Sequence, residues 1–242
     1  MRTFRLKWTA LIGVGLVLAT ALVSCSSRDS EQAAEHLKKG KELLTAGQYE
    51  AATKELKKAA ELDIDAMEPR LLLGNAYRAL KRYDEAFEAY RAAKKVDRYV
   101  ATPHIESALA RVELGQIDVA IEELNHAIEL DSDNIAALIH LGRVSRMPRP
   151  PPKGDAETEL GRFVNPDPQA GYERAELNLS RAVELAPDNI EANYELAKTY
   201  EELGKRDEAV TTWQKVRQLV ANKPEHASVA AEATEALTRL SP

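Results

Sequence analysis

The chain has 242 residues, of which 44% are hydrophobic, 30% charged and 5% aromatic, and its formal net charge is -6. This apolar content is enough for a folded core, and the abundance of Ala, Leu, Glu and Lys favours helices over sheets. The acidic balance argues against a nucleic-acid partner, whose binding surface would be basic. The single cysteine excludes an internal disulfide.

Residues 1–24 have the features of a cleaved signal peptide. Arg2, Arg5 and Lys7 precede an uncharged apolar run that ends at Val23. This run is shorter than the roughly 20 residues that a membrane-spanning helix needs. An uncleaved membrane anchor is the alternative, and Cys25 would then be an incidental thiol.

The stretch Leu22-Val23-Ser24-Cys25 resembles the lipobox of bacterial lipoprotein signal peptides. The resemblance implies cleavage before Cys25 and acylation of this residue. Ser26 follows the cysteine, and by the same resemblance the protein is placed in the outer membrane, facing the periplasm. We therefore expect a lipidated cysteine and a tether over residues 25–32, with a folded domain over residues 33–242.

The folded domain contains a repeat of 34 residues. The stretches that begin at Ala46, Leu80 and Leu114 are similar to one another, and each follows the previous one by 34 residues. Each indicates a turn followed by an amphipathic helix, and a second helical stretch precedes each of them. Small residues recur at position 8 of the repeat (Gly40, Gly74, Ala108, Gly142), and alanines recur at positions 20 and 27. Helices can pack closely only where the side chains at their crossing are small, so this pattern predicts paired helices.

This spacing and residue pattern resembles the tetratricopeptide repeat, which consists of two antiparallel helices. The second unit shows the family pattern best, at Leu73, Gly74, Tyr77, Tyr83, Ala86, Tyr90 and Ala93. The resemblance implies an all-α, right-handed α-solenoid of about five helix pairs with a C-terminal capping helix. A generic helical bundle is the alternative, but a bundle would not keep a 34-residue register over several units.

The predicted repeats span residues 33–66, 67–100, 101–134, 135–189 and 190–223, and the capping helix spans residues 225–240. The fourth repeat is split by a proline-rich insert near residues 147–167, about 21 residues longer than the usual turn. Neither half of a repeat can bury its apolar face alone, so we expect the two halves to pair across the insert. We also expect the second helix of this repeat to begin early, near Pro168, because proline suits the first helical position.

No sequence motif of an enzyme or a metal site is present. A Gly-rich phosphate loop, a His-Glu-x-x-His motif and a Gly-x-Ser-x-Gly motif are all absent, and the five histidines lack the spacing of metal ligands. We therefore expect no catalytic activity, no cofactor and no metal.

The remaining candidate site is the concave groove that the first helices of such repeats line. We expect its partner-binding side chains at positions near 2, 5, 9 and 12 of these helices. They are Lys41, Leu71, Asn75, Arg78, Ile105, Leu109, Ile139, Arg143, Arg146, Tyr194 and Lys198. An apolar centre with basic groups around it suits a peptide that has an apolar anchor and an acidic end. The alternative is that the apolar residues pack on neighbouring helices and that the charges only solubilise the protein.

These features together predict a non-catalytic scaffold that is anchored by lipid and binds a protein or peptide partner in the bacterial envelope. The combination is similar to the architecture of type IV pilus secretin pilots and outer-membrane assembly lipoproteins. A peptidoglycan- or glycan-binding regulator of cell-wall enzymes is the alternative, and aromatic side chains in the groove would support it. The sequence leaves the partner, the envelope pathway and the oligomeric state open.

Overall fold

A computed structural model describes residues 28–148 and 168–241 of the chain. The signal peptide, Cys25 and most of the proline-rich insert lie outside the described residues. The structure divides into two compact units, of which unit 1 extends to Arg98 and unit 2 begins at Tyr99. Each unit is described by itself.

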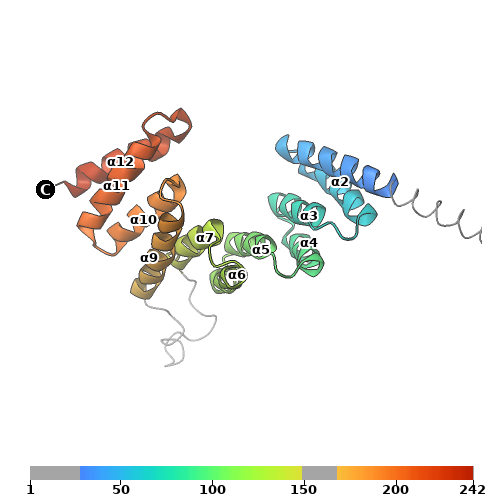
Figure 1. The fold of residues 1–242 in the computed structure, drawn as a ribbon, viewed down its shortest axis with the longest axis horizontal. Coiled ribbons are helices and arrows are strands. Elements are labelled where there is room, and N and C mark those ends of the chain that lie inside the picture. Colours follow the sequence, from blue (N-terminus) through green and yellow to red (C-terminus); the bar gives the residue numbers. More distant parts are fainter. Residues whose placement is uncertain (1–27, 149–167, 242) are drawn as a thin grey trace, which may run out of the picture. The chain divides into compact units, whose positions relative to one another are not determined.

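The described residues are helical and contain no strand, which confirms the predicted all-α class (Figure 1). Unit 1 begins with a helix over residues 28–45, so that part of the predicted tether is already helical. Residues 28–32 contain Arg, Glu and Gln but no Gly or Pro, so nothing in this stretch stops the helix. The unit continues with α2 (Tyr49–Leu62), α3 (Glu68–Ala79) and α4 (Tyr83–Val96).

The described residues of unit 2 form three helix pairs and a final helix. The first two pairs are α5 (Thr102–Glu113) with α6 (Ile117–Leu130), and α7 (Ile135–Ser145) with α9 (Pro168–Leu185). The third pair is α10 (Ile190–Glu202) with α11 (Arg206–Val220). A short 3₁₀ turn, Pro224–His226, precedes α12 (Ala227–Leu240), so the last α-helix begins two residues later than the sequence suggested.

Small residues at position 8 allow the paired helices to approach closely. A Cβ added at Gly40 would lie 2.6 Å from Leu56 Cδ2, and one added at Gly142 would lie 2.5 Å from Leu179 Cγ. A Cβ added at Gly74 would lie even closer to the ring of Tyr90. The large residue at position 24 therefore fills the space that the glycine leaves, as the sequence pattern predicts.

In the part of unit 2 that the structure describes, the core consists of three consecutive clusters. The first joins α5, α6 and α7, the second joins α7, α9 and α10, and the third joins α10, α11 and α12. Since α7 and α10 each contribute to two clusters, every repeat buries its apolar surface against the next one. This is the nearest-neighbour packing of a helical repeat protein.

The two halves of the split repeat pack against each other as expected. Leu138 and Ile139 of α7 share a cluster with Ala175, Leu179 and Ala182 of α9. The second helix begins at Pro168, which confirms the early start. The contact between α7 and α9 therefore keeps the two helices that flank the insert together.

Candidate functional site: a charge network on α7, α10 and α12

The first helices of repeats 4 and 5 are held in register by asparagine caps. The side chain of Asn134 accepts a hydrogen bond from the N–H of Ala137 at 3.0 Å, and that of Asn189 accepts one from Ala192 at 2.9 Å. An asparagine at this position satisfies a backbone donor that the helix leaves free. The caps therefore fix where α7 and α10 begin, and so which side chains face each other.

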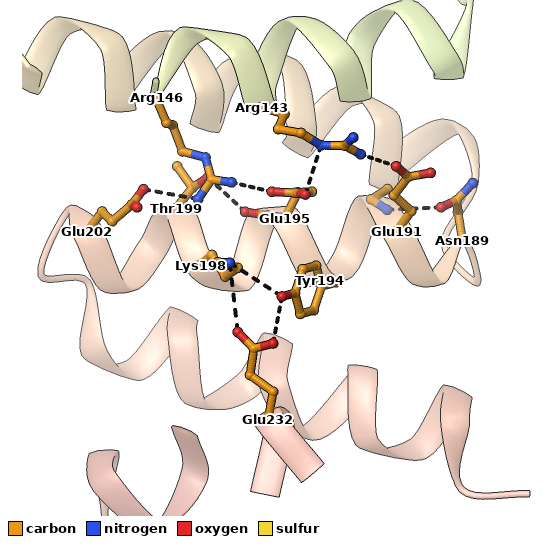
Figure 2. Close-up of polar contacts among 11 residues, drawn as sticks. Arg143, Arg146, Asn189, Glu191, Tyr194, Glu195, Lys198, Thr199, Glu202 and Glu232 are labelled. Carbon is orange, nitrogen blue, oxygen red and sulfur yellow. Dashed lines mark hydrogen bonds and ion pairs between the residues drawn. The ribbon is translucent and has the colours of Figure 1, made fainter. Parts of the chain in front are cut away.

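Arg143 of α7 and Arg146, the residue that follows this helix, form ion pairs with three glutamates of α10 (Figure 2). Arg143 donates from Nε to Glu195 Oε1 at 3.0 Å and from Nη2 to Glu191. Arg146 donates from Nη1 to Glu202 Oε2 at 3.0 Å and from Nη2 to Glu195. Glu195 thus accepts from both arginines and joins the two pairs into one network.

The centre of this network is buried. The side chains of Arg146 and Glu195 are only 8% and 9% exposed. Thr199 is also buried, and its hydroxyl donates to the backbone oxygen of Glu195 at 2.8 Å. Removing one partner of a buried ion pair leaves an uncompensated charge and costs about 3–5 kcal/mol. The network therefore fastens α7 to α10.

A second polar group lies beside this network and joins α10 to α12 (Figure 2). The hydroxyl of Tyr194 donates to Glu232 Oε2 at 2.6 Å, and Lys198 Nζ donates to the Tyr194 hydroxyl at 3.3 Å. Burial and the hydrogen bond to Glu232 raise the pKa of Tyr194. Burial opposes the charge on Lys198, but the hydrogen bond to Tyr194 and the attraction of Glu232 outweigh it, so the pKa of Lys198 lies above its ordinary value. Both groups therefore keep their protons at neutral pH.

The ring of Tyr194 is already engaged within the protein. Lys198 Nζ lies 5.0 Å from the ring centroid, and the ring of Trp213 packs edge-on at a centroid distance of 5.6 Å. The indole N–H of Trp213, a residue of α11, donates to Glu201 Oε1 at 2.6 Å. This aromatic pair therefore belongs to the packing of α10, α11 and α12.

Of the predicted groove residues, the structure places four close together: Arg143 and Arg146 in the ion-pair network, and Tyr194 and Lys198 in the polar group beside it. The arginines are paired with glutamates of the same chain, so they differ from the open basic groups that the sequence suggested. The network and the polar group beside it together contain three cations (Arg143, Arg146 and Lys198) and four carboxylates (Glu191, Glu195, Glu202 and Glu232). Together they therefore carry no excess of positive charge.

Two predicted contact residues of unit 2 require a correction. Ile105 and Ile139 are only 6% and 3% exposed and belong to core clusters. Both side chains pack against neighbouring helices, which is the alternative that the sequence left open. Leu109 is half-buried and keeps part of its side chain at the surface.

The predicted residues of unit 1 are placed separately. Lys41 forms an ion pair with Glu68 Oε1 at 2.7 Å across the first two repeats. Asn75 accepts a hydrogen bond from the Tyr90 hydroxyl at 2.8 Å, while Leu71 and Arg78 are half-buried. A groove that runs through both units stays a prediction.

Sequence reasoning missed the acidic half of the network, namely Glu191, Glu195, Glu202 and Glu232. A signal was present, because Glu191, Glu195 and Glu202 follow one another at helical intervals of four and seven residues. Residues at such intervals share one face of a helix. Charged stripes of this kind usually face solvent, so the spacing alone does not distinguish a buried network from a solvated surface.

Two negative findings apply to residues 28–148 and 168–241. No group of three or more His, Cys, Asp and Glu side chains there could hold a metal ion. No helix in the same ranges is long and apolar enough to cross a membrane.

Three family models match parts of the chain. Two are tetratricopeptide-repeat models, which match residues 37–99 and 104–134. The third is described as regulator of microtubule dynamics protein 1-3 and matches residues 160–241. No curated protein matches the sequence at a significant level.

Solved structures of helical repeat proteins are similar to this chain. PilF of Pseudomonas aeruginosa has a TM-score of 0.61 and 18% identity, with 88% of this chain and 94% of PilF covered. TTC0263, a thermophilic TPR protein of Thermus thermophilus, has a TM-score of 0.60 and 18% identity, with 85% and 99% covered. YrrB, a TPR protein with an unusual peptide-binding site, has a TM-score of 0.55 and 19% identity, with 89% and 98% covered.

At these identities the structural likeness shows the fold alone. It agrees with the two repeat models and with the position-8 packing described above. The chain therefore carries tetratricopeptide repeats, folds as an α-solenoid of that type, and has the general character of a protein-interaction scaffold.

Proposed function

We propose that this protein is a non-catalytic adaptor, anchored by lipid at Cys25, that holds a protein partner in the bacterial cell envelope. Repeat proteins of this class present extended surfaces on which a partner can bind. The lipobox-like sequence before Cys25 and the uncharged apolar run support the anchor. A periplasm-facing position at the outer membrane follows from the same resemblance.

The observation that carries the binding proposal is the exposed part of the network on α7, α10 and α12. The inner groups, Arg146 and Glu195, hold the helices together, whereas the outer groups reach solvent. The side chain of Glu191 is 52% exposed, that of Glu232 is 45% exposed and that of Lys198 is 38% exposed. These outer groups can exchange contacts with a partner while the buried pair keeps the scaffold intact.

The experiment is site-specific photo-crosslinking in cells. A photoreactive amino acid is placed at Lys198, on the proposed partner face, and in a matched strain at Leu177, which is 73% exposed on α9. We expect one or a few reproducible protein adducts from position 198 and none of the same adducts from position 177. If general cross-linking of the native protein also yields no reproducible partner, the adaptor proposal is wrong.

The anchor needs a separate test. Cys25→Ser removes the thiol that would be acylated, so we expect the variant to lose incorporation of labelled palmitate and to leave the membrane fraction. Membrane association that persists without palmitate would instead indicate an uncleaved apolar anchor. The crosslinking test is read separately, because it compares the adducts of positions 198 and 177 within the same protein.

A glycan- or peptidoglycan-binding regulator remains the second candidate. Such binding commonly uses exposed aromatic faces, but Lys198 and Trp213 already occupy the ring of Tyr194. We therefore expect the purified protein to stay in solution when cell-wall sacculi are sedimented. Co-sedimentation that Tyr194→Ala abolishes would favour the glycan function over the adaptor.

A further inference from the structure

The helix α12 is held to the rest of unit 2 mainly by small side chains. Its two buried residues are Ala233 and Ala236. The buried residues of the neighbouring helix α11 include Trp213, Val216 and Val220. An alanine removes less apolar surface from water than these larger side chains do. The packing of α12 therefore stabilises the unit less than the packing of α11 does.

The stretch that joins α11 to α12 lies at the surface, and residues 221–225 are all exposed. The N–H of Lys223 donates to the backbone oxygen of Val220 at 3.0 Å, and the N–H of His226 donates to Lys223 at 2.9 Å. These hydrogen bonds are local, and Pro224 has no N–H to donate. Movement of α12 about this stretch therefore requires only local hydrogen bonds to change.

Two side chains of α12 make polar contacts with α10. Glu232 accepts the hydrogen bond from Tyr194 described above, and its Oε1 lies 3.8 Å from Lys198 Nζ (Figure 2). Near the other end of the helix, Arg239 Nη2 donates to Glu201 Oε2 at 2.5 Å. The side chains of Glu232 and Arg239 are 45% and 58% exposed, so water reaches both of them.

Detachment of α12 would leave no buried charge without a partner. Glu201 would keep the hydrogen bond from the indole N–H of Trp213. Lys198 is 38% exposed, and water could replace its contact with α12. Arg206 is exposed, and water could likewise replace the backbone oxygen of Leu240, to which it donates at 2.9 and 2.6 Å. Separation of α12 therefore lacks the penalty that the buried ion pair imposes on separation of α7 from α10.

The contact of Glu232 also places an acid of α12 on the proposed partner face. Lys198 pairs with this acid, whereas Arg143 and Arg146 pair with glutamates of α10. Glu195 attracts Lys198 as well, but it accepts hydrogen bonds from both arginines. A further carboxylate at Lys198 would place five carboxylates beside three cations, which like-charge repulsion opposes. A carboxylate of a partner can therefore bind there when Glu232 leaves.

We propose that α12 is a reversible cap on the partner face, and that Glu232 takes the place of an acidic side chain of the partner. The partner contributes an amphipathic helix with the pattern of α12, in which an acid precedes two small residues that correspond to Ala233 and Ala236. This helix replaces α12 and covers the apolar surface around Trp213, which α12 covers in the absence of the partner. The proposal rests on the adaptor function proposed above and adds the chemistry of the partner.

The first test measures hydrogen exchange in the purified full chain and compares the amides of α12 with those of α11. A helix that opens by itself exchanges before the rest of its unit. We expect α12 to exchange at least tenfold faster than α11. Glu232→Gln should raise the rate in α12 at least threefold and change the rate in α11 less than twofold.

Glu235→Gln is the matched control for this experiment. It removes the same charge from an exposed site on the same helix, and the carboxylate of Glu235 attracts Arg239. We expect the rate in α12 to stay within twofold of the wild-type rate. If α12 and α11 exchange together in all three proteins, α12 is a fixed part of the unit and the proposal is wrong.

The second test uses a labelled synthetic peptide with the sequence of residues 224–241, which carries Glu232, Ala233 and Ala236. Its binding to the full chain is measured by fluorescence anisotropy. We expect saturable binding that is at least threefold tighter for the Glu232→Gln chain, because the cap of this chain is weaker. The peptide that itself carries Glu232→Gln should bind this chain at least threefold more weakly. Absence of saturable binding, or equal affinities of the two peptides, would overturn the proposal.

Both measurements use purified protein, so their outcome is separate from that of the crosslinking in cells. A fixed α12 together with reproducible adducts from position 198 would overturn the cap and leave the adaptor function standing. A reversible cap with a preference for the acidic peptide, but without any partner in cells, would instead overturn the adaptor function.

Discussion

Two neighbouring repeats of unit 2 form the same helix pair with very different connections. In the intact repeat, the turn Leu114–Gln116 joins α5 to α6, and Gly115 adopts a φ of 71° that favours glycine. In the split repeat, residues 146–167 separate α7 from α9. Both pairs nevertheless place a small residue at position 8 under Leu124 or Leu179 at position 24.

The two repeats differ in how their helices are joined away from this crossing. In the intact repeat, Nδ1 of His104 lies 2.7 Å from Glu123 Oε2, and the hydroxyl of Ser107 donates to Glu123 Oε1 at 3.1 Å. In the split repeat, Leu138 and Asn178 take the positions of His104 and Glu123, and Leu138 packs in the apolar cluster. Close apolar packing, and not a short turn, therefore holds the split repeat together.

The split repeat also has an additional helical turn near its insert. The helix α9 spans Pro168–Leu185, which makes it longer than α6 at Ile117–Leu130. Gly171 permits this extension, because a Cβ there would lie 2.5 Å from the backbone oxygen of Ser145. A long connection raises the entropic cost of closing the pair by only about 1 kcal/mol, so one more packed turn can offset it.

The largest effect is expected where the split repeat is fastened to the next repeat. Arg146→Ala leaves Glu195 buried with less compensation, and we expect the free energy of unfolding of unit 2 to fall by about 3–5 kcal/mol. Urea unfolding followed by the fluorescence of Trp213 measures this change. Arg174→Ala, on the exposed surface of α9, should shift the midpoint little. An equal shift in both variants would show that α7 does not depend on this ion pair.

The comparison between the intact and the split repeat is tested by replacing the leucine at position 24 with alanine in each repeat. Leu124 and Leu179 are both fully buried, so each change to alanine should lower the free energy of unfolding by about 2–5 kcal/mol. We expect the two losses to agree within about 1 kcal/mol, because the helix crossing is the same in both repeats. A much smaller loss for Leu179→Ala would mean that the halves of the split repeat are only loosely paired.

A smaller, pH-dependent effect is expected at the polar pair of the first repeat. His36 and Glu55 occupy the same repeat positions as His104 and Glu123, and their side chains approach to 2.7 Å. The hydrogen bond from His36 lowers the pKa of Glu55; burial opposes this shift, and Lys39 and Lys58 add to it. Because the folded-state pKa lies below the ordinary value of 4.5, the ionised carboxylate stabilises unit 1 above that pH. This stabilisation is lost as the pH falls through the lower, folded-state pKa.

The corresponding variant is Glu55→Gln. We expect it to lose about 1 kcal/mol of stability near pH 7 and to lose less than the wild type on further acidification below about pH 4.5. Unit 1 contains no tryptophan among its described residues, so circular dichroism at 222 nm is the appropriate probe. If the two proteins lose stability in parallel as the pH falls, the pair does not contribute in this way.

Most of the fold could be predicted from the sequence, because the pairing of the helices depends on the volume of the side chains at their crossings. Gly40, Gly74 and Gly142 recur in a 34-residue register, and only small residues allow the close helix approach that the structure shows. The pairing of α7 with α9 was predictable for the same reason. The 3₁₀ turn before α12 was not, since local turn geometry depends on a few residues around Pro224.

The candidate site was predicted less completely because charge patterns on a helix are ambiguous. The sequence indicated Arg143 and Arg146 as open basic groups, but the choice between solvent, a partner and the next repeat depends on tertiary packing. In the structure both arginines donate to Glu195 of the next repeat. This pairing depends on how α10 packs beside α7, which the charge pattern of one helix does not reveal. The same ambiguity placed Ile105 and Ile139 in the groove, although their side chains complete the core.

The smallest expected effect concerns the insert itself. Deleting residues 148–165 and joining the remaining ends by a short turn should leave the fold intact, because the contacts of Gly142 with Leu179 and of Ser145 with Gly171 do not involve the deleted residues. Shortening the connection lowers the entropic cost of pairing α7 with α9, so we expect unit 2 to gain about 1 kcal/mol of stability. Urea unfolding followed by Trp213 fluorescence gives the change, and an unfolded or strongly destabilised variant would show that the insert takes part in the packing of the split repeat.

The same variant tests whether the insert contributes to partner binding. Its photo-crosslinked adducts at position 198 are compared with those of the full chain. Unchanged adducts make it a tolerated insertion, whereas their loss from a folded variant makes it part of the partner-binding surface.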